Sequence, residues 1–441
     1  MSFRKEFTLE KTILESVSAE KENSAPVSFG WTDRLFRSVF IKALSKMQKG
    51  SVRVIDPFCG NYFLGNTESP QNPEFHSGMI RVNSKDFYRK AVLFGDIGFS
   101  EGYLDGDWDT DNIIHVLNWF LLNVETNPSV SGTKKFRPHI RFFNFLNRLY
   151  HLKRDNTVRG SRKNIIEHYD LGNSFYRLFL DRTMTYSSAY FNRENLSLEE
   201  AQAEKYKALA DRLFISRDMH ILEIGSGWGG FSLYLAKRFG CRITTVTISD
   251  EQYAYSKALF EREGVSSLID IQLKDYRHIE GRFDRIVSIE MLEAVGHRHL
   301  ETYFRKCSDL LNPDGLIGLQ VITSPDSRYE EFRTGVDFIQ KHIFPGSLLP
   351  SIGRINEAVN KTGTMHMYSL LDMGMSYAKT LRLWLKGFEE NLSQVYSLGF
   401  DERFARLWRY YLSYCAAAFE MRNISVMQMV YTRPNNRTLI S

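Results

Sequence analysis

The stretch that most constrains how this chain folds is HILEIGSGWGGFSLYLAKRFG, which occupies residues 220–240. An apolar strand pattern leads into a turn with four glycines, and an amphipathic helix pattern follows the turn. Glycine adopts backbone conformations that side chains disfavour, and the start of the helix presents unpaired N–H groups with a positive dipole end. The stretch therefore predicts a strand, a tight turn and a helix that together let a ligand approach the backbone.

Strand and helix patterns continue to alternate along the chain after this unit. That alternation predicts a parallel, doubly wound α/β sheet of Rossmann-like type with helical insertions. An insertion is expected near 324–352. We expect strands at 219–224, 241–247, 269–273, 283–289, 315–322 and 426–432, and helices at 229–238, 251–263, 298–311, 374–397 and 402–421.

The length of 441 residues exceeds that of an ordinary single domain, and 43% hydrophobic with 25% charged residues is a globular composition. Helical spacing within 35–44 and an apolar helix at 113–124 indicate a smaller N-terminal α+β domain. We divide the chain into an arm at 1–30, a small domain at 31–130, a basic amphipathic linker helix at 131–160 and the sheet domain at 161–441.

Two features resemble metal or redox sites, and we expect both to have a structural role only. The acidic, glycine-dotted segment 95–109 lacks the ligand spacing of a calcium loop, so we predict a structural turn there. The four cysteines have no paired spacing, which supports neither a zinc site nor a disulfide framework and fits a reducing compartment; they are Cys59, Cys241, Cys307 and Cys415. No metal is predicted.

Charge and hydropathy predict a cytoplasmic protein. The net charge of +5 is mild for this length and does not by itself argue for nucleic acid. No apolar run approaches the roughly 18 residues needed to span a bilayer, and the N-terminus is charged rather than signal-like. We therefore expect no nucleic-acid partner.

A local basic segment at 134–163 is the main departure from this mild charge, with ten Lys or Arg against one acid, Asp155. Aromatic and aliphatic residues recur there at three- and four-residue steps, which predicts a basic amphipathic helix. Two interpretations stay open. The helix is either a linker that packs its aromatics on a neighbouring domain, or an attachment to an anionic membrane surface.

The residues around the glycine turn favour S-adenosylmethionine as the ligand. Glu223, directly before the turn, is typical of turns that bind this cofactor. The following strand, CRITTVTISDEQ, ends without the lone acid that marks an NAD ribose site. It offers hydrogen-bonding side chains instead, at Thr247, Ser249 and Gln252.

Several spaced motifs then resemble one family: EHYDLGNSFYRLFLDRTMTYSSAYF, the turn itself, VTISDEQ, DRIVSIEMLEAVG and IFPGSLLPS. Over residues 160–432 the chain resembles the cyclopropane fatty acid synthases and mycolic acid cyclopropane synthases, and GFSEGYLDGDWD resembles the lipid-associated small domain of the bacterial phospholipid enzymes. The resemblance implies a methyltransferase fold and methyl transfer from S-adenosylmethionine to the cis double bond of an unsaturated acyl chain on membrane phospholipid, which forms a cyclopropane. It also implies a peripheral protein on the cytoplasmic membrane.

The resemblance implies two sets of site residues. Those expected to contact the cofactor are Tyr186, Ser187, Gly225, Ser226, Gly227, Trp228, Thr247, Ile248, Ser249, Gln252 and Tyr276. In the family, the base is attributed to a bound bicarbonate, whose ligands match Ser188, Glu293, Gln320, the backbone at Ile322, and Tyr377.

Two of these positions depart from the family, which has cysteine at the position of Ser188 and histidine at that of Gln320. A hydroxyl donates to an anion as a thiol does, whereas an amide never carries a proton for it. Glu293 is then the clear ionisable acid of the set, and burial should raise its pKa toward useful base strength. Whether bicarbonate binds is left open.

The alternatives to a cyclopropane product are a methyl-branched or methylene fatty acid, N-methylation of a small amine, or a lipid-binding protein with a degenerate catalytic centre. Intact Gly225, Gly227, Glu293 and Tyr377 argue against the last of these. The sequence leaves the oligomeric state open and is compatible with a homodimer.

Overall fold

A computed structural model describes residues 29–66, 77–124 and 171–439, and its described chain divides into two compact units. The small unit contains the described residues up to 124 together with 402–417. The large unit contains 171–401 and 418–439. The sequence division had assigned 402–417 to the sheet domain, whereas the structure groups it with the small unit. The predicted basic helix at 134–163 and the N-terminal arm before residue 29 lie outside the described residues.

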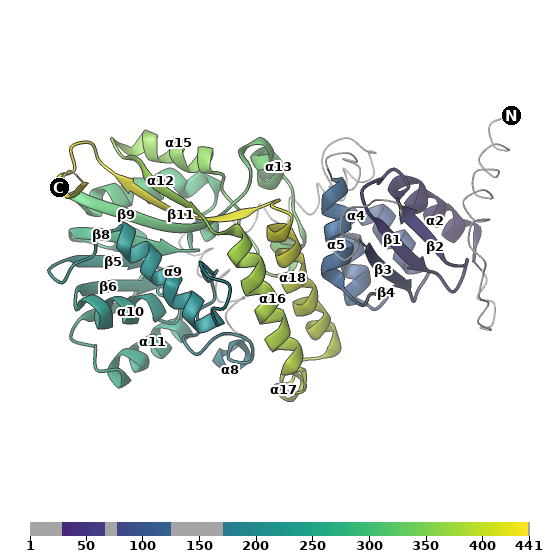
Figure 1. Ribbon diagram of the computed structural model, residues 1–441, viewed down its shortest axis with the longest axis horizontal. Helices are drawn as coiled ribbons and strands as arrows, with labels where there is room; N and C mark the ends of the chain where they lie inside the picture. Colours follow the sequence, from purple (N-terminus) through teal and green to yellow (C-terminus); the bar gives the residue numbers. More distant parts are fainter. Residues whose placement is uncertain (1–28, 67–76, 125–170, 440–441) are drawn as a thin grey trace. The chain divides into compact units, whose positions relative to one another are not determined.

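The small unit is a four-stranded sheet with helices (Figure 1), as the predicted α+β domain requires. The strand order is β2-β1-β3-β4, with β1 antiparallel to β2 and parallel to β3. Val52, Val54 and Ile80 are fully buried under the helices. The elements are α2 (Trp31–Leu44), β1 (Ser51–Ile55), β2 (Tyr62–Gly65), β3 (Ser77–Val82), α4 (Asp86–Leu104), β4 (Trp108–Asp109) and α5 (Ile113–Asn123).

The acidic segment 95–109 forms the second half of α4 and the turn into β4. The helix kinks at Gly95, which has φ +62°. Lys90 Nζ lies 2.7 Å from a carboxylate oxygen of Asp105 and 2.6 Å from one of Asp107. These two acids therefore serve ion pairs inside the small unit.

The large unit is a seven-stranded sheet in the order β10-β11-β9-β8-β5-β6-β7 (Figure 1). The five strands from β9 to β7 are parallel, which confirms the predicted doubly wound sheet. The strands are β5 (His220–Ile224), β6 (Arg242–Thr247), β7 (Ile269–Leu273), β8 (Phe283–Ile289), β9 (Leu311–Thr323), β10 (His366–Asp372) and β11 (Ser425–Thr432).

One edge of this sheet is antiparallel. Strand β11 runs antiparallel to β9, and β10, which the sequence did not predict, runs antiparallel to β11. None of the β10 side chains is fully buried, so its sequence HMYSLLD carries no clear apolar face. Edge strands of this kind give a weak periodicity signal.

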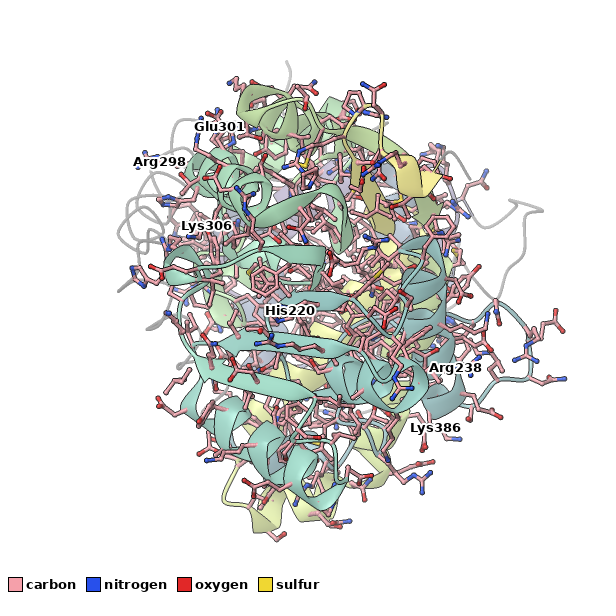
Figure 2. All side chains as sticks on the ribbon, turned by 90° about the vertical axis from the view of Figure 1, so that its left-hand side faces the viewer. His220, Arg238, Arg298, Glu301, Lys306 and Lys386 are labelled. Atoms are coloured by element: carbon pink, nitrogen blue, oxygen red, sulfur yellow. The ribbon has the colours of Figure 1, made fainter. Side chains whose placement is uncertain are left out.

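Helices cover both faces of this sheet. Apolar residues of α9, α10 and α11 form one core, and those of α12 and α15 form the other. Glu301 and Lys306, both labelled in Figure 2, lie on α12, and Glu301 pairs with Lys361 of α15 at 3.1 Å. The helices are α8 (Asn173–Tyr176), α9 (Leu198–Arg212), α10 (Gly230–Phe239), α11 (Asp250–Arg262), α12 (Leu300–Leu310), α13 (Tyr329–Thr334), α14 (Phe338–His342), α15 (Ile352–Thr362), α16 (Gly374–Glu390) and α17 (Leu392–Ser397).

The predicted helix at 374–397 is thus interrupted at Asn391, where α16 ends and α17 begins. The predicted helix at 402–421 is α18 (Glu402–Glu420). Among the helices of the described ranges, none is long and apolar enough to cross a membrane.

Candidate active site

The cofactor turn joins β5 to α10 at the carboxyl edge of the sheet. Three of its glycines have positive φ: Gly225 at +95°, Gly227 at +49° and Gly229 at +85°. A Cβ on Gly229 would lie 2.8 Å from the Phe260 ring, so only glycine fits there without movement. A Cβ on Gly227 would meet no protein atom within 4 Å. The turn therefore opens at Gly227 onto space that a ligand can fill.

Glu223 stabilises this turn through hydrogen bonds to the neighbouring helix and strand. Its carboxylate accepts hydrogen bonds from Ser232 Oγ of α10 at 2.5 Å and from Thr245 Oγ1 of β6 at 2.6 Å. Burial raises the pKa of Glu223 to about 7, although both hydroxyls favour the charged form. The acid that marks the turn in the sequence thus ties the strand, the helix and the neighbouring strand together.

The end of β6 brings several predicted cofactor residues together. Thr247 Oγ1 donates to Gln252 Oε1 at 2.9 Å and accepts from the backbone N–H of Ser249 at 3.1 Å. Ser249 caps α11 by accepting from the N–H of Gln252. These three side chains are buried, whereas Ile248 between them is half-buried.

Aromatic rings cover the turn from α8. Trp228 Nε1 donates to Asn173 Oδ1 at 2.6 Å, and its ring centroid lies 5.1 Å from that of Tyr176. Tyr176 also packs against Tyr186 at 5.3 Å. Sequence reasoning named Trp228 and Tyr186 but missed the two residues of α8. Two further predicted residues are Ser226, whose Oγ donates to the carbonyl of Gly227 at 3.0 Å, and Tyr276, whose ring packs against Tyr303 at 5.3 Å.

A carboxylate that the sequence analysis did not single out lies at the centre of the predicted anion site. Glu290 directly follows β8, and one of its oxygens accepts from the Ser188 backbone N–H and from Gln320 Nε2, both at 2.8 Å. Its other oxygen accepts from Tyr377 Oη at 2.9 Å. Three donors from β9, α16 and the segment before α9 therefore hold one partly buried carboxylate.

The backbone holds Glu290 in a conformation that is uncommon for a side-chain-bearing residue. Its φ is +50°, and its N–H donates to the carbonyl of Gln320 at 2.7 Å. The next residue, Met291, lies against the cofactor turn, because a Cβ on Gly225 would be 3.2 Å from its side chain. Removal from water raises the pKa of Glu290, and its three donors and Lys205 oppose that shift.

Glu293, which the sequence suggested as the base, occupies a neighbouring position with different contacts. Its Oε1 accepts from the Ile322 backbone N–H at 2.5 Å, while Oε2 is buried without a hydrogen-bond partner in the described chain. Burial and the negative charge of Glu290 raise the pKa of Glu293 to about 8. Burial thus raises the pKa of Glu293 as it raises that of Glu290, and the expectation that Glu293 acts as the base stays a prediction.

Ser188 contacts Glu290 through its backbone and not through its hydroxyl. The Ser188 Oγ donates to the carbonyl of Ala189 at 2.9 Å, and the backbone N–H is the group that reaches Glu290. The structure thus brings Ser188, Gln320 and Tyr377 together around the side chain of Glu290. The signal for Glu290 was present as the first glutamate of IEMLEAVG.

Comparisons with known proteins agree with this geometry. Residues 156–429 match the family model described as mycolic acid cyclopropane synthetase. The chain is 35% identical over 358 residues to the tuberculostearic acid methyltransferase of Mycobacterium tuberculosis, covering 78% of this chain and 81% of that protein. It is also 35% identical over 358 residues to the cyclopropane-fatty-acyl-phospholipid synthase of Escherichia coli, covering 80% and 87%.

The solved structures include one that holds a product of the cofactor. The structure of mycolic acid cyclopropane synthase CmaA1 complexed with SAH and CTAB matches with a TM-score of 0.58 and 31% identity. The match covers 62% of this chain and 98% of that one. The open space at Gly227 and the hydrogen-bonding groups at the end of β6 fit the same cofactor. The chain therefore belongs to the mycolic acid cyclopropane synthetase family and is an S-adenosylmethionine-dependent methyltransferase.

Proposed function

We propose that the protein methylates the cis double bond of an unsaturated acyl chain carried by membrane phospholipid, and that the product is a cyclopropane fatty acid. The observation that carries this proposal is the Glu290 carboxylate, fixed by three donors beside the cofactor turn. The names of the two relatives that are 35% identical, one a fatty-acyl-phospholipid synthase, support an acyl substrate.

The reaction needs a proton acceptor at this position. S-adenosylmethionine supplies a methyl group to the alkene, which leaves a carbocation on the acyl chain. Glu290 takes a proton from the transferred methyl carbon, and the C–H electron pair closes the ring as a new C–C bond. Because its pKa is raised, Glu290 is a stronger base than an exposed glutamate. The donors Ser188, Gln320 and Tyr377 keep it oriented during the transfer.

A methylene-bearing or methyl-branched chain is the second candidate product. If a hydride first shifts from the methyl-bearing carbon to the cationic carbon, the same base takes a proton from the methyl carbon and leaves a C=CH₂ group on the chain. Loss of a proton from the neighbouring chain carbon leaves a methyl-branched alkene instead. The 35% identity to a tuberculostearic acid methyltransferase supports this second candidate product.

The test is to incubate the purified protein with S-adenosylmethionine and vesicles of an unsaturated phospholipid, and to analyse the acyl chains by mass spectrometry. We expect each modified chain to gain one CH₂ group. Ozone cleaves a methylene product but leaves a cyclopropane intact, so ozonolysis separates the two candidates. Unmodified acyl chains alongside methylated small amines would instead support amine N-methylation.

Helix α2 supports the membrane part of this proposal. Trp31 is 77% exposed and Leu35, one turn later, is 53% exposed. Exposed basic residues accompany them, with Arg34 and Lys42 on the same helix and Lys46 just after its end. Tryptophan and leucine insert favourably at a bilayer interface, while nearby basic side chains attract anionic headgroups. We infer that this face of α2 contacts an anionic lipid surface.

Replacing Trp31 and Leu35 together by alanine should weaken binding of the full chain to phosphatidylglycerol vesicles about tenfold, because two interfacial apolar contacts are lost. Cosedimentation measures the binding. The matched control replaces Tyr396 and Leu398, which are also exposed but lie in the large unit, and should leave binding unchanged. Equal affinities for all three proteins would contradict the assignment to α2.

A further inference from the structure

Lys205 is a buried cation that the proposed mechanism has not used. It lies on α9 with no exposed surface, and its Nζ donates to Ser187 Oγ at 2.7 Å. The same Nζ lies 4.5 Å from the centre of the Tyr206 ring. Lysine is almost never fully buried without a charged partner, yet the hydrogen-bond partner here is a hydroxyl. This unusual burial indicates a role beyond packing.

The charges around Lys205 come from both halves of the active site. Burial lowers the pKa of Lys205, and the carboxylates that oppose this shift are Glu290, then Asp181, then Glu223. Glu223 supports the cofactor turn, and Glu290 lies in the anion site. Lys205 therefore acts electrostatically on both sites from one position.

The hydrogen bonds connect Lys205 to Glu290 through two consecutive residues. Ser187 accepts from Lys205 through its side chain, and Ser188 donates its backbone N–H to Glu290. One turn before Lys205, Gln202 Nε2 donates to the carbonyl of Ser187 at 3.0 Å. Helix α9 thus holds the same short segment by one charged and one neutral side chain.

The groups that act on Glu290 in the described chain include both an acid and a cation. Glu290 raises the pKa of Glu293, so the two acids disfavour each other's charged forms. Lys205 is a cation that lowers the pKa of Glu290, while Gln320, Tyr377 and the Ser188 N–H are uncharged donors. The charges that act on Lys205 are those of Glu290, Asp181 and Glu223, and the ring of Tyr206 lies beside its Nζ.

We propose that Lys205 is a positioning residue for methyl transfer: its ammonium group, anchored on Ser187, keeps Glu290 ionised as the proton acceptor and holds the Ser187–Ser188 segment in place. This inference rests on the proposed role of Glu290. It assigns no covalent step to Lys205, since the proton still moves from the methyl carbon to Glu290.

The test compares Lys205→Met with Gln202→Met in the full chain, by recording kcat against pH. Loss of the positive charge raises the pKa of Glu290, so the Lys205→Met enzyme should need a higher pH, with the acid limb of the profile shifted upward by about one unit or more. Gln202→Met removes a neutral anchor of the same segment, so any loss of kcat should come without a shift. Identical profiles with equal losses would overturn the proposal and leave Lys205 a structural residue.

A second measurement keeps the inference separate from the proposed function, because it needs no turnover. Infrared titration follows the C=O band of protonated Glu290, assigned as the band that disappears in Glu290→Gln. Its midpoint should move to higher pH in Lys205→Met and stay in place in Gln202→Met. If Lys205→Met does not fold, Lys205→Gln keeps a donor for Ser187 while removing the charge, and should show the same shift. An unmoved midpoint in the folded variant would overturn the proposal even if methyl transfer is active.

Discussion

Glu290→Gln should lower kcat by about 10²- to 10⁴-fold, the contribution expected of a positioned general base. The substitution keeps the size and shape of the side chain, but an amide cannot accept the proton. Its three donors, from Ser188, Gln320 and Tyr377, hold the carboxylate of Glu290 and not that of Glu293. Steady-state kinetics at the plateau of the pH profile measures the loss, and calorimetry should show unchanged S-adenosylmethionine binding.

Glu293→Gln is the matched control for this prediction. Because the pKa of Glu293 is raised to about 8, the protonated carboxyl that predominates below that pH is already close to an amide in shape and charge. Its replacement should therefore cost much less activity at pH 7 than the replacement of Glu290. A larger loss in Glu293→Gln than in Glu290→Gln would return the role of base to Glu293.

Carbonate dependence provides an independent check on the same position. With the Glu290 carboxylate in the predicted anion site, removal of dissolved carbonate should leave the activity of the unmodified enzyme unchanged. Glu290→Gly empties that site, and the φ of +50° suits glycine. We expect its residual activity to rise when bicarbonate is added. Full carbonate dependence of the unmodified enzyme would show that the Glu290 side chain does not replace the anion.

Gly227→Val should weaken S-adenosylmethionine binding by about 10- to 100-fold or abolish it, since overfilling a packed site costs about 1–3 kcal/mol and each 1.4 kcal/mol is tenfold. A Cβ at this position meets no protein atom within 4 Å, so the side chain enters the space left for the ligand. Isothermal calorimetry measures the affinity.

A second glycine separates ligand exclusion from backbone strain. Gly264 has φ +70° and also has nothing within 4 Å of a built Cβ, but it lies in the loop between α11 and β7. Gly264→Val should therefore lower the melting temperature as Gly227→Val does, with cofactor affinity unchanged. Equal affinity in both variants would remove the turn from the cofactor site.

The sheet that carries the site could be predicted well from the sequence, because β5 to β9 are apolar runs bounded by turn residues. Their predicted bounds differ from the observed ones by at most a few residues. The edge strand β10 could not be predicted, since its half-exposed side chains lack a periodic apolar face. Local pattern thus identified the buried strands and missed the one without a buried face.

The side chains that meet in the anion site could not be predicted from local sequence patterns, because the fold brings them together. Ser188, Gln320 and Tyr377 are separated by more than fifty residues from one another, and their meeting point is a property of the fold. Which glutamate of IEMLEAVG enters it depends on the positive φ at Glu290, which no local pattern indicates. Lys205 and Lys207 are likewise indistinguishable in LEEAQAEKYKALADR, yet the first is buried and the second pairs with Asp211 at the surface.

The left-handed backbone at Glu290 also bears on how such an enzyme changes over generations. Glutamate and glycine codons differ by a single nucleotide. The backbone of Glu290 has a positive φ, which glycine adopts without steric cost. If Glu290 is the base, as we propose, one point mutation exchanges its carboxylate for a space that a dissolved anion can fill, without rebuilding the loop. Under the same proposal, an enzyme of this family changes in one step between a form that carries its own carboxylate base and a form that binds a dissolved ion, and the same donors would hold the base in either form.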